Sequence, residues 1–388
     1  MAAIGQADDT YLDLPLEEEE LRKAADKVYV APPLTLMWWR FRKHKLAVFS
    51  AGVLVVFYFV AIFCEFVAPY DPDGALLQFK QVPQTSLHIV DVQGQWQAPF
   101  VYLHRRAMDP TSFEITYLED TSARFPLEFG VHGFTYKLFG LWETDLHLFG
   151  VPAGKEQQGV FLLGTDRLGR DMFSRVAYGA RLSLSMGMVS VFLSLLLGVV
   201  LGVVSGYYGG RVYTVIQRAI EFIRTIPTIP LYMTLSAALP VNWPIEWVYF
   251  GITLILALVG WTFLARVVRG RFLAMREEDF VLAARLNGSS EMRIILRHML
   301  PSFLSYVIAA LTLNIPNLIL AETGLSFIGL GLRAPAISWG VLLQEATNIS
   351  SLMLAPWVLT PGIAVVISVL AFNFVGDGLR DAADPYAR

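Results

Sequence analysis

The chain has 388 residues, a formal net charge of −3 and a hydrophobic fraction of 55%. Charged residues make up only 16%, against roughly 25% in an ordinary soluble domain, and the mean hydropathy is +0.52. These values argue against a soluble enzyme and a disordered chain, and also against a nucleic-acid-binding protein, because such a protein would need a basic face. They indicate an integral membrane protein with several spans.

Six stretches have the length and composition of membrane-spanning helices, each of which needs about 20 apolar residues to cross about 30 Å of hydrocarbon. They lie at about 46–67, 182–206, 212–239, 247–265, 302–321 and 356–375. The third stretch is the weakest, because Arg218, Glu221 and Arg224 lie in its first half. The sequence therefore predicts an all-α polytopic membrane protein with six transmembrane helices.

Charge predicts the orientation of these spans. A basic, aromatic segment at 38–45 precedes the first span, and the loop 269–301 carries six arginines, a pattern of the cytoplasmic side. We therefore expect both termini inside, with 1–45 and 377–388 as cytoplasmic tails. Four arginines at 167–181 conflict with this on the predicted outer side, where Asp166 and Asp171 can pair with some of them.

A polar block separates the first two spans. Short stretches of alternating polar and apolar residues, such as 114–118 and 134–138, are divided there by Gly, Pro and Asp residues. We predict a small, folded, β-rich insert outside the membrane over 68–165, followed by a core domain at 166–376 that holds helices 2 to 6. The insert is either a spacer packed on the membrane domain or a docking surface for an external partner.

The sequence lacks the familiar motifs of catalytic, nucleotide-binding and metal-binding sites. It has no phosphate-binding loop, no paired-histidine metal motif and no nucleophile elbow, and its single cysteine, Cys64, excludes an internal disulfide and a cysteine-based zinc site. We therefore expect no catalytic residue, and no metal or cofactor bound by this chain.

The cytoplasmic loop 269–301 carries the most specific local pattern. Asp279 favours the start of a helix through its charge, and Asn287-Gly288 would end that helix because both residues tolerate a left-handed cap. A second helical run at 291–299 stops at Pro301, which suits the first turn of the fifth span. Small side chains on the first helix would let another protein approach closely, and an ordinary connector is the alternative.

At these residues the chain resembles the permease subunits of binding-protein-dependent ATP-binding-cassette importers. Their signature is E-A-A, three residues, G, nine residues, I-x-L-P. Ala283-Ala284, Gly288 and Leu300-Pro301 fall at those spacings, whereas Leu282 and His298 replace the family's Glu and Ile.

Further blocks resemble the dipeptide, oligopeptide and nickel branch of that family. They are G-T-D-x-x-G-R-D at 164–171, G-Y-x-G-G at 206–210, a segment like E-A-x-L-S-F-L-G-L-G at 322–331, and shorter matches at 338–340, 355–357 and 376–381. The insert at 71–163, Tyr213 in place of Asp and Asn287 in place of Leu depart from the family pattern.

The resemblance implies a type I importer permease fold in a bacterial inner membrane. The partners it implies are a second homologous permease, two ATPase subunits that use ATP and Mg, an external substrate-binding protein and membrane lipid, with no nucleic acid. It also implies that the helix within 279–290 is the coupling helix that docks on the ATPase. The residues carried over to that role or expected to support it are Asp279, Ala283, Ala284, Arg285, Gly288, Arg293 and Arg297.

Two spans carry candidate residues of other kinds. In the second span Gly198, Gly202 and Gly206 share one helical face and predict close helix packing, with a role in the substrate path as the alternative. In the fifth span Asn314, Pro316 and Asn317 lie more than halfway across, and polar groups there face a wet cavity or another helix. We take these three residues as candidates for the translocation path, with interhelical bonding as the alternative.

Glu322 lies about one membrane thickness beyond Pro301. At that outer boundary the carboxylate need not be buried.

The sequence thus predicts a permease subunit of an ATP-driven importer, for peptides in the first instance. The same importer class for oligosaccharides, opines or nickel is the alternative, because a permease sequence does not separate these substrates. A membrane enzyme or receptor that uses the insert is a more distant alternative, because the acidic residues of the insert are scattered.

Overall fold

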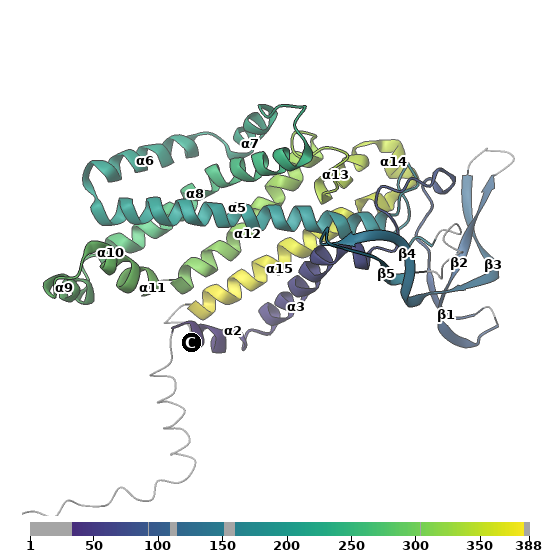
Figure 1. The fold of residues 1–388 in the computed structure, drawn as a ribbon, viewed down its shortest axis with the longest axis horizontal. Coiled ribbons are helices and arrows are strands. Elements are labelled where there is room, and N and C mark those ends of the chain that lie inside the picture. Colours follow the sequence, from purple (N-terminus) through teal and green to yellow (C-terminus); the bar gives the residue numbers. More distant parts are fainter. Residues whose placement is uncertain (1–32, 92, 109–114, 151–159, 303, 384–388) are drawn as a thin grey trace, which may run out of the picture.

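The computed structural model describes residues 33–91, 93–108, 115–150, 160–302 and 304–383. It is an elongated bundle of helices with a β-rich region at one end (Figure 1). In the described residues five helices are long and apolar enough to cross a membrane: α3 (Lys45–Ile62), α5 (Met172–Tyr208), α8 (Ile245–Met275), α12 (Leu304–Phe327) and α15 (Thr360–Ala383). The prediction of a mostly helical membrane protein is confirmed.

The third predicted span is not one helix, so five of the six predicted spans are single long helices in the described residues. The third is divided into α6 (Gly210–Thr225) and α7 (Thr228–Ala237). Ile226 between them is extended, with ψ 130°, because the ring of Pro227 disfavours the helical region for the residue before it. In Figure 1 the two helices follow one another back along the bundle from the end of α5.

The other spans lie where the sequence predicts them but differ in length. The first ends at Ile62 and is followed by one turn, α4 (Cys64–Val67). α5 begins at Met172, well before the predicted 182, because the carboxylate of Asp171 caps it by accepting hydrogen bonds from the backbone N–H and the hydroxyl of Ser174 at 2.7 and 2.6 Å. α15 continues to Ala383, so the predicted tail 377–388 is helical over its described residues.

The two ends of the described chain lie together. α2 (Pro33–Phe41) and the last turns of α15 meet at the end of the bundle away from the strands (Figure 1). Met37 and Phe41 of α2 pack there with Ala382 of α15. The first and last described helices therefore lie at the same end of the bundle.

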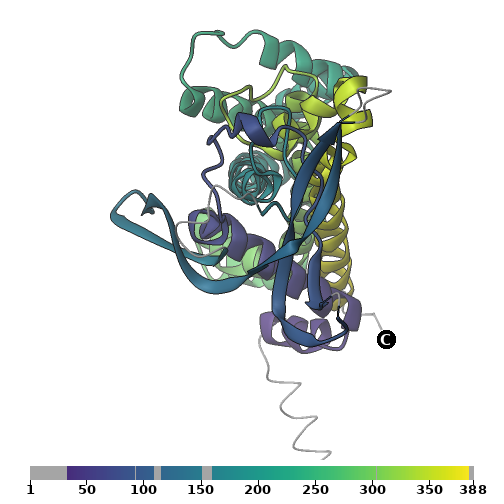
Figure 2. The same ribbon diagram turned by 90° about the vertical axis from the view of Figure 1, so that its right-hand side faces the viewer.

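The β-rich insert is present between α4 and α5, as predicted. β1 (Leu87–Val90), β2 (Trp96–Met108) and β3 (Ile115–Pro126) form an antiparallel sheet in that order. β4 (Glu128–Leu138) and β5 (Trp142–Gly150) form a separate antiparallel hairpin. Figure 2, a view onto this end, shows the hairpin reaching sideways, away from the sheet.

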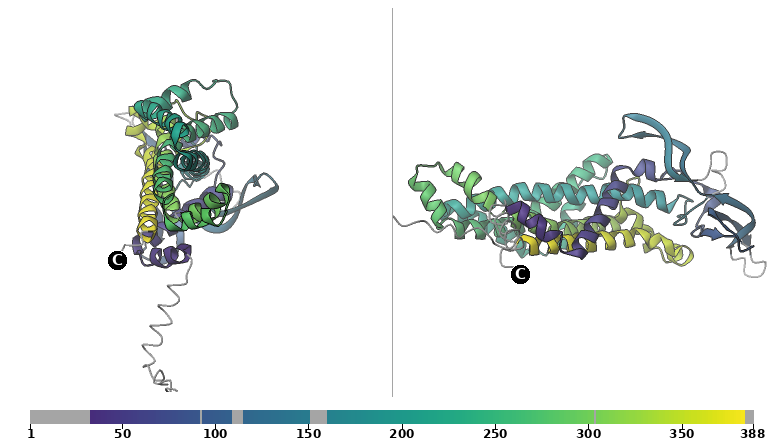
Figure 3. Two further views of the ribbon diagram at one scale, coloured as in Figure 1. Left: turned by 90° about the vertical axis from the view of Figure 1, so that its left-hand side faces the viewer. Right: turned by 90° about the horizontal axis from the view of Figure 1, so that it is seen from below.

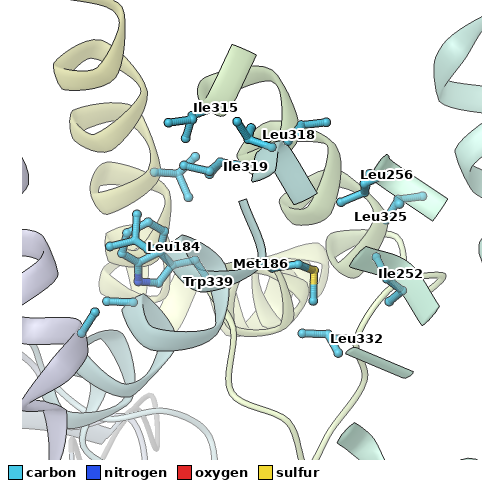
Figure 4. Close-up of a cluster of buried hydrophobic side chains, with 14 of the residues drawn as sticks. Leu184, Met186, Ile252, Leu256, Ile315, Leu318, Ile319, Leu325, Leu332 and Trp339 are labelled. Carbon is cyan, nitrogen blue, oxygen red and sulfur yellow. The ribbon is translucent and has the colours of Figure 1, made fainter. Parts of the chain in front are cut away.

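The core joins α5, α8, α12 and the short α13 (Trp339–Leu343), as Figure 4 shows. Trp339 is fully buried, and its indole N–H donates to the carbonyl of Val176 in α5 at 3.0 Å. The large buried side chains around it are Leu184, Met186, Ile252, Leu256 and Ile319. The remaining short segments are η1 (Leu77–Phe79), α9 (Asp279–Leu286), α10 (Glu291–Arg293), a π-helical stretch (Ile294–Met299), α11 (Leu300–Ser302), η4 (Gln344–Thr347), α14 (Ile349–Leu354) and η5 (Pro356–Leu359).

Candidate functional site

The short helix α9 stands at the end of the bundle opposite the insert (Figure 1). Asp279 is the first residue of this helix. The helix ends in a C-cap that is closed by two backbone hydrogen bonds. The N–H of Gly288 donates to the carbonyl of Arg285 at 2.9 Å, and the N–H of Ser289 donates to the carbonyl of Ala284 at 3.1 Å. Gly288 has a φ of +72°, so the left-handed turn expected from Asn287-Gly288 is present.

α9 has an inward and an outward face. Val281 and Ala284 are buried against Phe272 and Met275 of α8 and against the π-helical stretch. Ala283 is exposed. The two adjacent alanines therefore do not form one outward surface of small residues, as the sequence suggested, because successive residues of a helix point about 100° apart.

The outward face of α9 is apolar. Leu282 and Leu286, four residues apart, are exposed on it, whereas Phe280 lies about 160° around the helix from Leu282. Leu286, at 89%, is more exposed than any other large hydrophobic side chain in the described residues. Met292 and Leu296, which follow the cap in the chain, are also exposed. Sequence reasoning missed Leu286, although an apolar side chain next to a Gly cap on a charged cytoplasmic loop was a usable signal.

The three arginines of this region have different surroundings. The guanidinium of Arg285 lies over the ring of Tyr207, 5.5 Å from its centroid. Arg293 and Arg297 are exposed and have no ion-pair partner among the described residues. They are therefore available to acidic groups of another protein.

Pro301 lies inside a helical run and not in the first turn of the fifth span. Proline lacks an N–H and its ring crowds the carbonyl four residues earlier, so a regular helix is disturbed just before it. Here the N–H of Leu300 donates to the carbonyl of Ile295, the five-residue step of a π-helix. This stretch buries Ile294, Ile295 and Met299 beside α9.

A cavity of about 600 Å³ lies between α6, α7, α8 and α12. Asn314 and Asn317 both line it, whereas Pro316 is buried and is not among its lining residues. The amide of Asn317 makes only a long contact, 3.5 Å, with the carbonyl of Leu313 in its own helix. The two amides are thus brought together at one cavity, and no interhelical hydrogen bond of either amide occurs among the described residues.

The cavity walls are mainly apolar, with a few polar groups. Arg224 of α6 lines the cavity, together with Tyr232 and Thr262. Arg218 pairs with Glu221 at 2.8 Å, but Arg224 has no ion-pair partner among the residues the structure describes. Sequence reasoning missed the place of Arg224 at the cavity.

Gly198, Gly202 and Gly206 line the contact between α5 and α8. A Cβ atom at Gly202 would lie 2.7 Å from the Cβ of Val268 and 2.8 Å from the carbonyl oxygen of Ala265. At Gly198 the nearest atom would be the Cβ of Leu264 at 2.8 Å. The two helices therefore approach more closely than any residue with a side chain would allow.

Glu322 is completely buried, although its position at the outer boundary did not require it. Its carboxylate accepts hydrogen bonds from the hydroxyl of Ser326 at 2.9 Å and of Ser183 at 3.3 Å. Ser183 in turn accepts the backbone N–H of Trp339 at 3.0 Å. The carboxylate thus joins α5, α12 and α13 because α13 folds back over this end of the bundle.

Three of the four arginines at 167–181, namely Arg170, Arg175 and Arg181, have acidic partners nearby. Arg170 pairs with Asp166 at 2.6 Å, and Arg181 binds the carboxylate of Glu65 through two nitrogens. Asp171 pairs with none of them, since it caps α5, and burial raises the pKa of its carboxyl to about 6. These acids offset most of the positive charge that conflicts with the expected orientation.

The chain is similar to known proteins over most of its length. The family described as binding-protein-dependent transport system inner membrane component matches residues 198–388, and the N-terminal TM domain of oligopeptide transport permease C matches residues 32–88.

Three relatives illustrate this similarity. The oligopeptide transport system permease protein OppC of Escherichia coli (strain K12) is 39% identical over 251 residues, 64% of this chain and 80% of that protein. OppC of Haemophilus influenzae is 36% identical over 256 residues, 66% and 78% of the two chains. The dipeptide transport system permease protein DppC of Alkalihalophilus pseudofirmus is 39% identical over 223 residues, 57% and 71%.

Proposed function

This chain belongs to the family of binding-protein-dependent transport system inner membrane components, and from that premise we propose that it forms one half of a path for peptides across a bacterial inner membrane. It is the multi-pass permease component of an ATP-binding-cassette importer, and ATP is used by separate ATPase subunits. The path is completed by a second homologous permease, and an external binding protein delivers the substrate.

The cavity between α6, α7, α8 and α12 carries the proposal for a peptide. Asn314 and Asn317 present amides that can donate to and accept from peptide groups, and Arg224 suits a carboxylate. The apolar wall tolerates side chains of different kinds. A nickel path would be better served by imidazole ligands than by these groups, and the permease relatives are named for oligopeptide and dipeptide transport.

Coupling to ATP hydrolysis is assigned to the segment 279–290. Its outward apolar face, formed by Leu282 and Leu286, is the surface that enters a cleft of the ATPase, with Arg293 and Arg297 beside it. Ala284 acts differently, since it packs α9 onto α8 and so transmits its movement to the bundle. Because the ATPase subunits are cytoplasmic, this assignment places α9 on the cytoplasmic side of the membrane and the insert on the external side.

Uptake by the assembled importer tests the substrate class. The permease pair, the ATPase subunits and the binding protein are reconstituted in proteoliposomes with ATP inside, and entry of a labelled pentapeptide is followed. We expect ATP-dependent uptake that unlabelled peptides suppress. If an oligosaccharide, an opine or Ni²⁺ suppresses uptake and unlabelled peptides do not, that compound, and not a peptide, is the substrate.

Asn317→Leu should lower peptide uptake in the same assay while leaving assembly unchanged. The change removes an amide that lines the cavity but keeps the side-chain size, and the position is exposed, so packing is little affected. Asn373→Leu in α15 is the matched control, because it also removes an amide from a spanning helix but lies away from the cavity. Equal uptake by the two variants would contradict the assignment of Asn317 to the path.

A further inference from the structure

The hairpin β4–β5 ends in an uncharged apolar turn. Leu138 pairs with Trp142, and the three residues between them, Phe139, Gly140 and Leu141, form the loop. Leu141 is 73% exposed and Trp142 is 63% exposed. Lys137 and Glu143 stand on either side of this turn, so charge is excluded from residues 138–142 but present immediately behind them.

The turn lies against the outer end of a spanning helix. The ring of Phe139 packs edge-on against Phe63, which directly follows α3, with 5.7 Å between the ring centroids. Phe139 holds a φ of +53°, a conformation that a bulky side chain adopts only when its surroundings require it. Gly140 has a φ of +71°, and a tight hairpin turn with 139 and 140 as its central residues needs positive φ at both. The turn geometry thus places the aromatic ring beside α3.

The neighbouring face of α3 is a lipid-facing surface. Phe59 and Ile62, in the last turn of that span, are exposed apolar side chains, and α3 buries the smallest share of its residues among the five spans. α3 also lies at the edge of the bundle opposite α6 and α7, where the proposed path is found (Figure 1). The apolar surface of the turn is thus continuous with a surface that the bilayer must cover.

We propose that residues 138–142 are an interfacial membrane anchor, which dips into the lipid leaflet at the insert end of the bundle. Trp and Phe belong at the boundary between headgroups and hydrocarbon. The N–H of Gly140 and of Leu141 donate to the carbonyls of Lys137 and Leu138, both at 3.1 Å, so the turn enters an apolar medium with these two donors already bonded. Lys137 and Glu143 limit how deeply the turn enters the leaflet, because their charges stay among the lipid headgroups.

The direction of the hairpin agrees with this placement. Seen from below, it stands out sideways from the helices, and its free end leans back toward them and not into the space beyond the insert (Figure 3, right). The anchor fixes the β-rich insert relative to the membrane plane through a second point, in addition to its attachment at α4 and α5.

Spin labels test the proposal in the full-length chain with its partner subunits in lipid nanodiscs. Because Cys64 is the only cysteine, a Cys64→Ala background accepts a single nitroxide at Leu141→Cys. Two matched controls are Phe129→Cys, 77% exposed at the other end of the same hairpin, and Trp96→Cys, 78% exposed on the neighbouring sheet. We expect the ratio of collisions with O₂ to collisions with a water-soluble nickel chelate to be several-fold higher at 141 than at either control.

Two outcomes would overturn the anchor. One is a label at 141 that meets the nickel chelate as freely as the label at 96. The other is shielding at 141 that arises only when the external binding protein is added, which would assign the turn to protein docking. Brominated lipids give an independent measurement, since they should quench a component of tryptophan fluorescence that disappears in Trp142→Tyr; equal quenching of both proteins would also contradict the proposal.

Discussion

Leu286→Glu should weaken the attachment of the ATPase subunits roughly 10- to 100-fold, because burial of a leucine side chain is worth about 1.5–3 kcal/mol and about 1.4 kcal/mol is tenfold in affinity. Leu286 is 89% exposed at the tip of α9 and contributes no core contact within the chain. The loss should therefore fall on the assembly and not on the fold. Binding of purified ATPase subunits to the permease in nanodiscs measures it directly.

Two variants separate this effect from its alternatives. Leu118→Glu places the same change on an exposed leucine of β3, at the opposite end of the molecule, and should leave ATPase attachment unchanged. Ala284→Glu puts a carboxylate on the buried face of α9 and should loosen that helix from α8, which faster amide exchange over 279–289 would reveal. If the Leu286→Glu variant binds the ATPase subunits as tightly as the parent does, the outward face of α9 does not contact the ATPase.

Gly202→Val should destabilise the bundle, since added volume in a close-packed contact costs about 1–3 kcal/mol and sometimes more. A Cβ there would lie 2.8 Å from the backbone oxygen of Ala265, which cannot move aside without α8. We expect the midpoint of thermal unfolding in nanodiscs to fall by several degrees and the yield of assembled importer to fall with it.

Gly270→Val is the control for this prediction. It places the same β-branched side chain on α8, near the same contact, but a Cβ at Gly270 has nothing within 4 Å. Its unfolding midpoint should stay close to that of the parent. If the two variants unfold at the same temperature, close approach at Gly202 is not what holds α5 against α8.

Much of the fold could be predicted because it depends on local properties of the chain. The apolar stretches identify the five long helices, since a spanning segment must satisfy its own backbone and be apolar along its length. α9 was predicted nearly to the residue, because its start at Asp279 and its cap at Gly288 are short-range interactions. The third stretch is interrupted at Pro227, where the proline itself signals the break although the average hydropathy of the stretch does not.

The sequence by itself determined the class of the protein, the positions of the spans, the β-rich insert and the short helix α9, each of which follows from composition or from contacts a few residues apart. Only the tertiary structure decided which alanine of α9 faces inward, that Glu322 is buried, and that Phe139 meets Phe63. α9 has apolar residues on both faces, so its periodicity does not choose between them. The carboxylate of Glu322 accepts a hydrogen bond from the hydroxyl of Ser183 in α5. Such contacts between segments far apart in the chain form only when the helices pack.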